Sequence, residues 1–224
     1  MSSTVKHLGI IPDGARRWAR ENNKSLDFAY LYSAQKLVEI FDAVFEKEVI
    51  LQSVYGLSKE NLGRKPEELT SVLQAAERLF RDLLPSLCKK WECSVHTVGR
   101  IDLLPISSYQ ALHFLSTETK KYKSRNSRKL YLLAAYNPWD ELIHAVKNAK
   151  TLSEDDVKNN LWVPEDIDLV LRTGFGKLIS NFLPLQSGYA EHVFIDKYFN
   201  DISLSDVFDA IEKFSSSGKR LLGQ

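Results

Sequence analysis

The 224-residue chain has few cysteines, no long apolar run and no excess of either charge. Its two cysteines, Cys88 and Cys93, form a Cys-x4-Cys spacing with no histidine between or next to them. Structural zinc needs four ligands, so this spacing indicates two reduced thiols in a cytoplasmic protein. The chain lacks the roughly eighteen consecutive apolar residues of a transmembrane helix, and its Met-Ser-Ser-Thr start is no signal peptide.

The charge balance and the glycine pattern exclude further classes of protein. Thirty basic residues stand against 29 acidic ones, whereas a generic nucleic-acid binder carries a basic excess. We therefore expect no nucleic-acid partner, and any polyanion site must be local. No glycine-rich phosphate loop of the Rossmann or Walker type occurs, which argues against a nucleotide-binding regulator without turnover. The length predicts one domain, residues 1–224, with a substantial core.

Short apolar runs alternate with stretches of helical spacing along the whole chain. The runs predict buried strands at Leu8–Ile11, Leu51–Tyr55, Val95–Val98, Leu130–Ala134 and Leu169–Leu171. The helical spacing predicts helices at Leu31–Phe45, Leu69–Leu84, Leu112–Lys121, Trp139–Ala149 and Val207–Phe214. Strands that alternate with helices predict an α/β fold with a mostly parallel sheet.

The first apolar run ends at Pro12-Asp13-Gly14, and a basic segment with Arg16 and Arg17 follows at once. A buried parallel strand delivers such a carboxylate to the carboxyl edge of the sheet, where ligands of α/β proteins bind. Asp13 could hold a divalent cation there while the two arginines clamp phosphate oxygens. The alternative is an ordinary strand–turn–helix in which Asp13 caps the helix.

Three later segments also place polar groups after apolar runs. Tyr55–Arg64 offers a hydroxyl, an amide and a guanidinium, and Asp168–Gly176 ends on Arg-Thr-Gly before a flexible loop. Ser187–Glu191 supplies an isolated acid within an apolar stretch. If these segments converge, Asp13 and Glu191 form a metal pair beside arginines, which would suit a magnesium diphosphate. The arginines in question are Arg17, Arg64 and Arg172.

These segments, in this order, resemble the motifs of the cis-prenyltransferase family, whose best-known members make undecaprenyl diphosphate. The resemblance spans nearly the whole chain. Its matching blocks are His7–Ala19, Tyr55–Arg64, Ala135–Leu142 (a loose match), Asp168–Gly174, Ser180–Leu183 and Tyr189–Glu191.

The resemblance implies a mostly parallel six-stranded sheet surrounded by helices, an apolar tunnel beneath the site, and a homodimer. It further implies that Asp13 carries the Mg²⁺ diphosphate of the allylic substrate and that Glu191 is the second metal ligand. Asn61 falls on a position described as a proton acceptor; an amide is a poor base, so we interpret it as an orienting partner and expect a diphosphate oxygen to take the proton. The predicted substrate-binding residues are Gly14, Arg16, Arg17, Trp18, Tyr30, Ser58, Arg64, Arg172, Lys177 and Ser180.

The chain departs from the family pattern at several positions of the site. Ala15 and Arg16 replace Asn and Gly, and Leu26 and Tyr30 replace an Arg and a His that help to bind the allylic diphosphate. Other departures are at Ala29, Ser33, Gly176, Leu178, and the C-terminal Arg220-Leu-Leu-Gly223.

These departures leave three hypotheses open. Pro12-Asp13-Gly-x-Arg-Arg-Trp18 and Phe182–Leu185 resemble the branch that makes lavandulyl-type diphosphates, which joins two dimethylallyl-type diphosphates head-to-middle. The second hypothesis is ordinary cis-elongation with isopentenyl diphosphate, and the third is a non-catalytic partner subunit. Phe41, Phe45 and Phe80 could close the apolar slot early, which would favour a short product, although plain core is the favoured interpretation for each ring taken singly.

Overall fold

The computed structural model describes residues 4–124 and 127–217, and its centre is a six-stranded sheet in which all neighbouring strands run parallel. The strand order is β3-β4-β2-β1-β5-β6. The predicted α/β fold with a six-stranded parallel sheet is therefore confirmed. The strands are β1 (His7–Ile11), β2 (Leu51–Tyr55), β3 (Ser94–Val98), β4 (Lys129–Leu133), β5 (Leu169–Thr173) and β6 (Glu191–Ile195).

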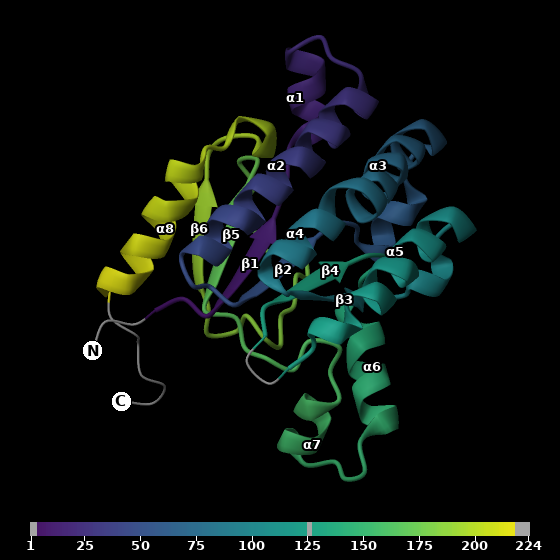
Figure 1. Cartoon of the computed structure of the whole chain (residues 1–224), viewed down its shortest axis with the longest axis vertical. Coiled ribbons are helices and arrows are strands. Elements are labelled where there is room, and N and C mark those ends of the chain that lie inside the picture. Colours follow the sequence, from purple (N-terminus) through teal and green to yellow (C-terminus); the bar gives the residue numbers. More distant parts are fainter. Residues whose placement is uncertain (1–3, 125–126, 218–224) are drawn as a thin grey trace.

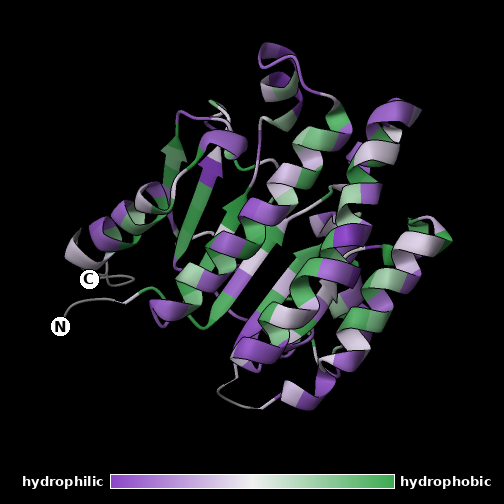
Figure 2. Cartoon of the chain, turned by 45° about the horizontal axis from the view of Figure 1, so that its top comes forward, coloured by the Kyte–Doolittle hydropathy of each residue, from purple (hydrophilic) through white to green (hydrophobic). Residues whose placement is uncertain are grey.

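Helices surround this sheet, with α8 beside β5 and β6 and with α2 crossing near β1 and β2 (Figure 1). The strands are largely apolar, whereas the helices mix apolar and polar residues around their circumference (Figure 2), as expected of helices that bury one side only. The helices are α1 (Ala15–Glu21), α2 (Leu26–Glu46), α3 (Pro66–Arg78), α4 (Leu84–Trp91), α5 (Ile106–Glu118), α6 (Pro138–Asn148), α7 (Glu154–Asn159) and α8 (Leu204–Ser217).

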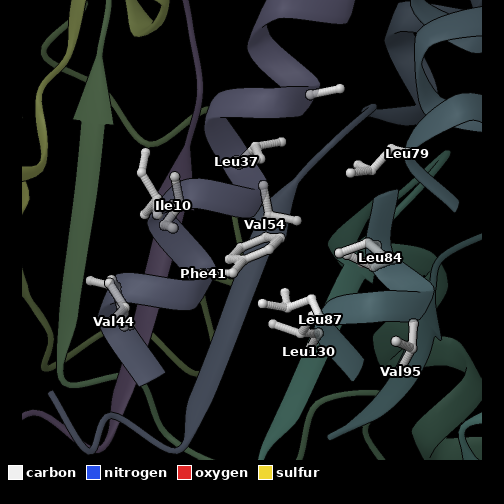
Figure 3. Packing of buried hydrophobic residues seen from close by; sticks show 14 of the residues in the cluster. Ile10, Leu37, Phe41, Val44, Val54, Leu79, Leu84, Leu87, Val95 and Leu130 are labelled. Carbon is white, nitrogen blue, oxygen red and sulfur yellow. The ribbon is translucent and has the colours of Figure 1, made fainter. Parts of the chain in front are cut away.

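The main hydrophobic core lies between α2, α4 and the sheet. Figure 3 shows Phe41 of α2 beside Val54 of β2, with Leu84 and Leu87 of α4 next to Leu130 of β4. The three elements meet because their sequences place branched and aromatic side chains at helical spacing on α2 and in continuous runs on the strands. This packing fixes α2 above the strand ends that carry the polar groups.

The helix predicted over Leu69–Leu84 is interrupted in the structure. α3 ends at Arg78, a π-helical turn spans Leu79–Leu83, and α4 begins at Leu84 with a proline at its second position. Pro85 has no N–H, and its ring would clash with the carbonyl of Arg81 in a continuous α-helix. The wider π turn avoids that clash. The interruption therefore follows from Pro85, which a prediction from apolar spacing alone does not take into account.

Gly9 in the middle of β1 lies against the ring of Phe182, which is fully buried. A Cβ added to Gly9 would be 2.6 Å from Cε1 of that ring. Phe182 in turn packs against Tyr55 of β2, with ring centroids 5.5 Å apart. The missing side chain at Gly9 therefore lets the segment after β5 fold back over the sheet.

We predict that Gly9→Ala lowers the free energy of unfolding by about 1–3 kcal/mol, because the ring of Phe182 must shift within a packed core. Urea denaturation followed by circular dichroism measures this change. Gly63→Ala is the matched control, since a Cβ at Gly63 meets no atom within 4 Å. An alanine at Gly9 that leaves the unfolding midpoint in place would contradict the packing described.

Candidate active site

An ion pair joins the carboxyl ends of β1 and β5, which are neighbours in the sheet. Nη2 of Arg172 donates to Oδ2 of Asp13 at 2.9 Å, and Nη2 of Arg17 lies 3.4 Å from the same oxygen. Arg172 is only 7% exposed, whereas the Asp13 side chain is 37% exposed. The carboxylate of Asp13 therefore lies between the largely buried guanidinium of Arg172 and the solvent.

The backbone at Asp13 is held by Thr173, the last residue of β5. The N–H of Asp13 donates to Oγ1 of Thr173 at 3.0 Å, and that hydroxyl donates to the carbonyl oxygen of Asp13 at 3.0 Å. Because β1 and β5 pair in parallel register, both strand ends reach the same edge. No role was predicted for Thr173 of the Arg-Thr-Gly motif, although a threonine at a strand end next to a predicted carboxylate was the available signal.

Arg172 is fixed on its other side by the loop after β5. Its Nη1 donates to Oγ of Ser180 at 2.8 Å and to the carbonyl oxygen of Leu178 at 2.6 Å. Ser180 and Asn181 have φ of 50° and 61°, in the left-handed region that costs L-residues roughly 1–2 kcal/mol each. Such strain persists where the surroundings determine the conformation, and it is concentrated at functional sites.

The opposite wall of the site is a short 3₁₀ helix after β2. Ser58 and Asn61 form a reciprocal capping box, and Oδ1 of Asn61 also accepts a hydrogen bond from Nη2 of Arg64 at 2.8 Å. Nη1 of Arg64 lies 3.5 Å from the hydroxyl of Tyr30 on α2. Oδ1 of Asn61 is thus occupied by these donors, which agrees with the interpretation of Asn61 as an orienting residue rather than a base.

Burial raises the pKa of Tyr30 and raises that of Tyr55 to about 12. Both hydroxyls therefore stay protonated at neutral pH and remain available as donors. Tyr55 uses its hydroxyl to donate to the carbonyl oxygen of Ser180 at 3.2 Å, which ties the end of β2 to the strained loop.

Most of these groups line one cleft of about 300 Å³ at the carboxyl edge of the sheet. Arg16 reaches it from the start of α1, and its Nη1 forms an ion pair with Oε2 of Glu68 on α3 at 2.8 Å. Glu68 was not among the predicted site residues, because it belongs to no motif. The predicted site residues that line the cleft are Asp13, Gly14, Arg16, Tyr30, Ser58, Asn61, Arg64, Arg172 and Ser180.

Three predicted substrate-binding residues are not part of the cleft lining. Arg17 donates to the carbonyl oxygen of Gly174 at 2.6 Å. Trp18 is buried among aromatic rings of α2, and its indole N–H donates to Asp201 at 2.7 Å. Lys177 pairs with Asp196. The structure thus gives Trp18 a packing role.

The predicted metal pair of Asp13 and Glu191 is not formed within one chain. Glu191 begins β6 opposite Leu169, and Leu169 is opposite Leu8 of β1. Glu191 is therefore level with a residue five positions before Asp13, roughly 16 Å away at ~3.3 Å per residue. The sequence did not reveal this distance, because Glu191 lies within an apolar stretch and its strand starts at the acid instead of ending there. The departures at Arg220 and Gly223 lie outside the described residues.

Asp13 alone suits a magnesium ion that arrives with a diphosphate. Both arginine contacts of its carboxylate are to Oδ2. Within residues 4–124 and 127–217, no group of three or more His, Cys, Asp or Glu side chains could hold a metal by itself. Mg²⁺ is typically bound through one or two carboxylates together with substrate phosphates and waters, so a single carboxylate beside arginines fits it.

An apolar cavity of about 70 Å³ adjoins the cleft, and both are bordered by Leu37, Val72 and Leu79. The tunnel implied by the resemblance stays a prediction; this cavity lies where it would begin. Phe80 lines the cavity, as predicted. Phe41 and Phe45 do not: they are fully buried in the core under α2. Their side chains occupy the turns of α2 farther from the cleft, so they pack against the sheet instead.

A parallel α/β sheet whose carboxyl edge holds arginines and one carboxylate beside an apolar cavity is suited to a ligand with an anionic head and an apolar part. A family model described as "Putative undecaprenyl diphosphate synthase" matches residues 11–222. The chain belongs to this family, and it is a prenyltransferase. In the described part of the chain, no helix is both long and apolar enough to span a membrane.

Individual relatives agree with this assignment. The tritrans,polycis-undecaprenyl-diphosphate synthase (geranylgeranyl-diphosphate specific) of Pyrococcus abyssi is 33% identical, over 96% of this chain and 86% of the relative. The structure is similar to lavandulyl diphosphate synthase from Lavandula x intermedia in complex with dimethylallyl diphosphate, with TM-score 0.88 and 20% identity over 96% and 97% of the chains. It is also similar to a probable undecaprenyl diphosphate synthase from Campylobacter jejuni, with TM-score 0.79 and 25% identity over 99% and 100%.

We predict that Asp13→Ala lowers kcat at least about a hundredfold, which corresponds to about 2.7 kcal/mol of transition-state stabilisation. The reason is the predicted role of Asp13, which is to hold magnesium against the departing diphosphate. Steady-state product formation measures kcat, and circular dichroism checks the fold. Retention of a tenth of the activity by a folded variant would contradict this role.

Proposed function

We propose that this prenyltransferase joins two five-carbon allylic diphosphates, such as dimethylallyl diphosphate, head-to-middle into a short branched or cyclised product. The proposal extends to the residues: Asp13 with Mg²⁺ supports one diphosphate, and Arg172 and Ser180 bind that of the second substrate. Glu191 stays a proposed metal ligand, but it would not share one ion with Asp13 of its own chain. The reduced cysteines support a cytoplasmic location.

In the proposed reaction, the C1–O bond of the first substrate breaks and its diphosphate leaves with the bonding electrons. A bound magnesium ion would stabilise the negative charge of that leaving group. C2 of the second substrate, which is the double-bond carbon nearer its diphosphate, then bonds to C1 of the first substrate. This leaves a tertiary cation at C3 of the second substrate. The cation loses a proton to a diphosphate oxygen or closes a ring first. Arg16 and Arg64 line the cleft as further fixed positive charges for the leaving group.

The observation that carries the short product is the size of the apolar cavity. At about 70 Å³ it is much smaller than the adjoining cleft of about 300 Å³, which suits a short hydrocarbon better than a long one. Leu104, Phe80 and Leu132 close it on the sides away from the cleft. The hydrocarbon of the first substrate cannot extend beyond this cavity. Its cation is therefore expected to react with a second small substrate.

Elongation with isopentenyl diphosphate is the second candidate, and a specific observation favours it. The Pyrococcus abyssi relative, at 33% identity, is named an undecaprenyl-diphosphate synthase. For this chain to act likewise, α2 and α3 would have to separate and enlarge the cavity. A non-catalytic partner is the weaker alternative, because Asp13, Arg172 and Arg64 are retained and border one cleft.

We predict that dimethylallyl diphosphate alone, with magnesium, yields a ten-carbon branched or cyclic diphosphate. Mass spectrometry and gas chromatography of the dephosphorylated products identify it. The parallel reaction with isopentenyl diphosphate added is the control. If the first reaction gives nothing and the second gives linear cis products, elongation is the function; if both give nothing, the proposed reaction of dimethylallyl diphosphate is excluded.

We further propose that the chain forms a homodimer through α6. Trp139, Ile143 and Val146 recur at helical spacing on α6 and are 68%, 50% and 42% exposed. Such an apolar stripe marks a protein interface more often than a free surface. Figure 1 shows α6 at one end of the sheet, away from α2 and α8.

We predict that Ile143→Glu converts the dimer to a monomer, because a carboxylate would be buried unpaired at the interface. Light scattering during size-exclusion chromatography measures the molar mass, which should fall by half. Phe114→Glu on α5 is the control, since Phe114 is similarly exposed, at 59%, but lies on another helix. A wild-type chain that elutes as a monomer overturns the dimer itself.

A further inference from the structure

A carboxylate at the end of α3 joins that helix to the beginning of α5. Oε1 of Glu77 accepts hydrogen bonds from the hydroxyls of both Ser107 and Ser108, each at 2.7 Å. One turn further along, Nη2 of Arg81 donates to the carbonyl oxygen of Ser107 at 3.3 Å. These hydrogen bonds involve charged groups, which makes them stronger than neutral ones. We call the contact of Glu77 with the two serines the α3–α5 latch.

The latch lies directly behind the far wall of the apolar cavity. Ser108 is 1% exposed and lines that cavity, as does Leu104 just before α5. Across from them, the π-helical turn that starts two residues after Glu77 contributes Leu79 and Phe80 to the same lining. The hydroxyl of Ser108 is thus the polar group of an otherwise apolar wall, and Glu77 satisfies it.

We propose that Glu77 is a positioning residue that limits the length of the hydrocarbon chain the enzyme accepts, by holding the start of α5 against α3. The inference rests on the proposed function, which places the hydrocarbon in this cavity. Glu77 lines a separate surface cleft beside Asp27 and Arg78, and not the diphosphate cleft, so it acts through the wall.

Without a directional contact between α3 and α5, the favourable burial of a longer hydrocarbon would separate the two helices and enlarge the cavity. Each buried methylene strengthens binding about fourfold, so one more five-carbon unit offers up to about a thousandfold if room can be made for it. The contacts of Leu104 and Phe80 are non-directional and can re-form around a longer chain. The two hydrogen bonds of the latch cannot, because they require one relative position of the two helices.

The test compares binding of two substrate analogues that cannot ionise, dimethylallyl thiolodiphosphate and farnesyl thiolodiphosphate, by isothermal titration calorimetry with magnesium. In the wild-type protein we expect the farnesyl analogue to bind no more tightly than the dimethylallyl analogue. In Glu77→Ala we expect it to bind at least tenfold more tightly, with the affinity for the dimethylallyl analogue unchanged. Glu77→Gln keeps an acceptor oxygen for both serines and should restore the wild-type ratio.

Asp82→Ala is the matched control, because Asp82 is an acidic residue of the π turn that also borders the surface cleft but does not contact Ser107 or Ser108. It should keep the wild-type ratio. A Glu77→Ala protein with the wild-type ratio, or a Glu77→Gln protein that behaves like Glu77→Ala, overturns the proposal. The proposed head-to-middle reaction fails separately, through the products of the wild-type enzyme, since these binding measurements involve no condensation.

Discussion

The contact between Asp13 and Arg172 is the interaction around which the site is organised. It joins two adjacent strands at their carboxyl ends, and each partner is held from behind, Asp13 by Thr173 and Arg172 by Ser180. A guanidinium this buried would be costly without a carboxylate, and the carboxylate keeps one face toward the cleft. The pair therefore joins the two strand ends and keeps the more exposed carboxylate toward the cleft.

Much of this arrangement could be predicted from the sequence. Continuous apolar runs located five strands to within two residues at either end, and Asp-Gly and Arg-Thr-Gly marked the two strand ends that meet. Glu191 was misplaced because periodicity does not tell whether a polar residue begins or ends a strand. The choice between core and cavity for Phe41 stayed open for a related reason: helical spacing shows that a residue faces inward, but not whether it meets the sheet or a cavity.

Several departures from the family pattern are accommodated together in the structure. Arg16, in place of a glycine, pairs with Glu68 on α3, and Tyr30, in place of a histidine, lies beside Arg64. Gly176, in place of the usual acid, leaves the space that Arg172 fills, because a Cβ there would be 2.9 Å from Nη2. The substitutions alter which side chains face the cleft while its positive charge is retained.

The separation of the contacting residues along the chain has a consequence for folding. Asp13 and Arg172 are 159 positions apart, and the hydroxyl of Tyr55 reaches a carbonyl 125 positions later. Closing such long loops costs conformational entropy, and this cost is offset only when the central strands are all paired. Parallel sheets of this kind are therefore slow to form. During synthesis, the β1 end emerges from the ribosome long before β5 exists. A truncated or partly folded chain lacks Arg172 beside Asp13 at the end of β1, and catalytic competence becomes a property of the completed fold.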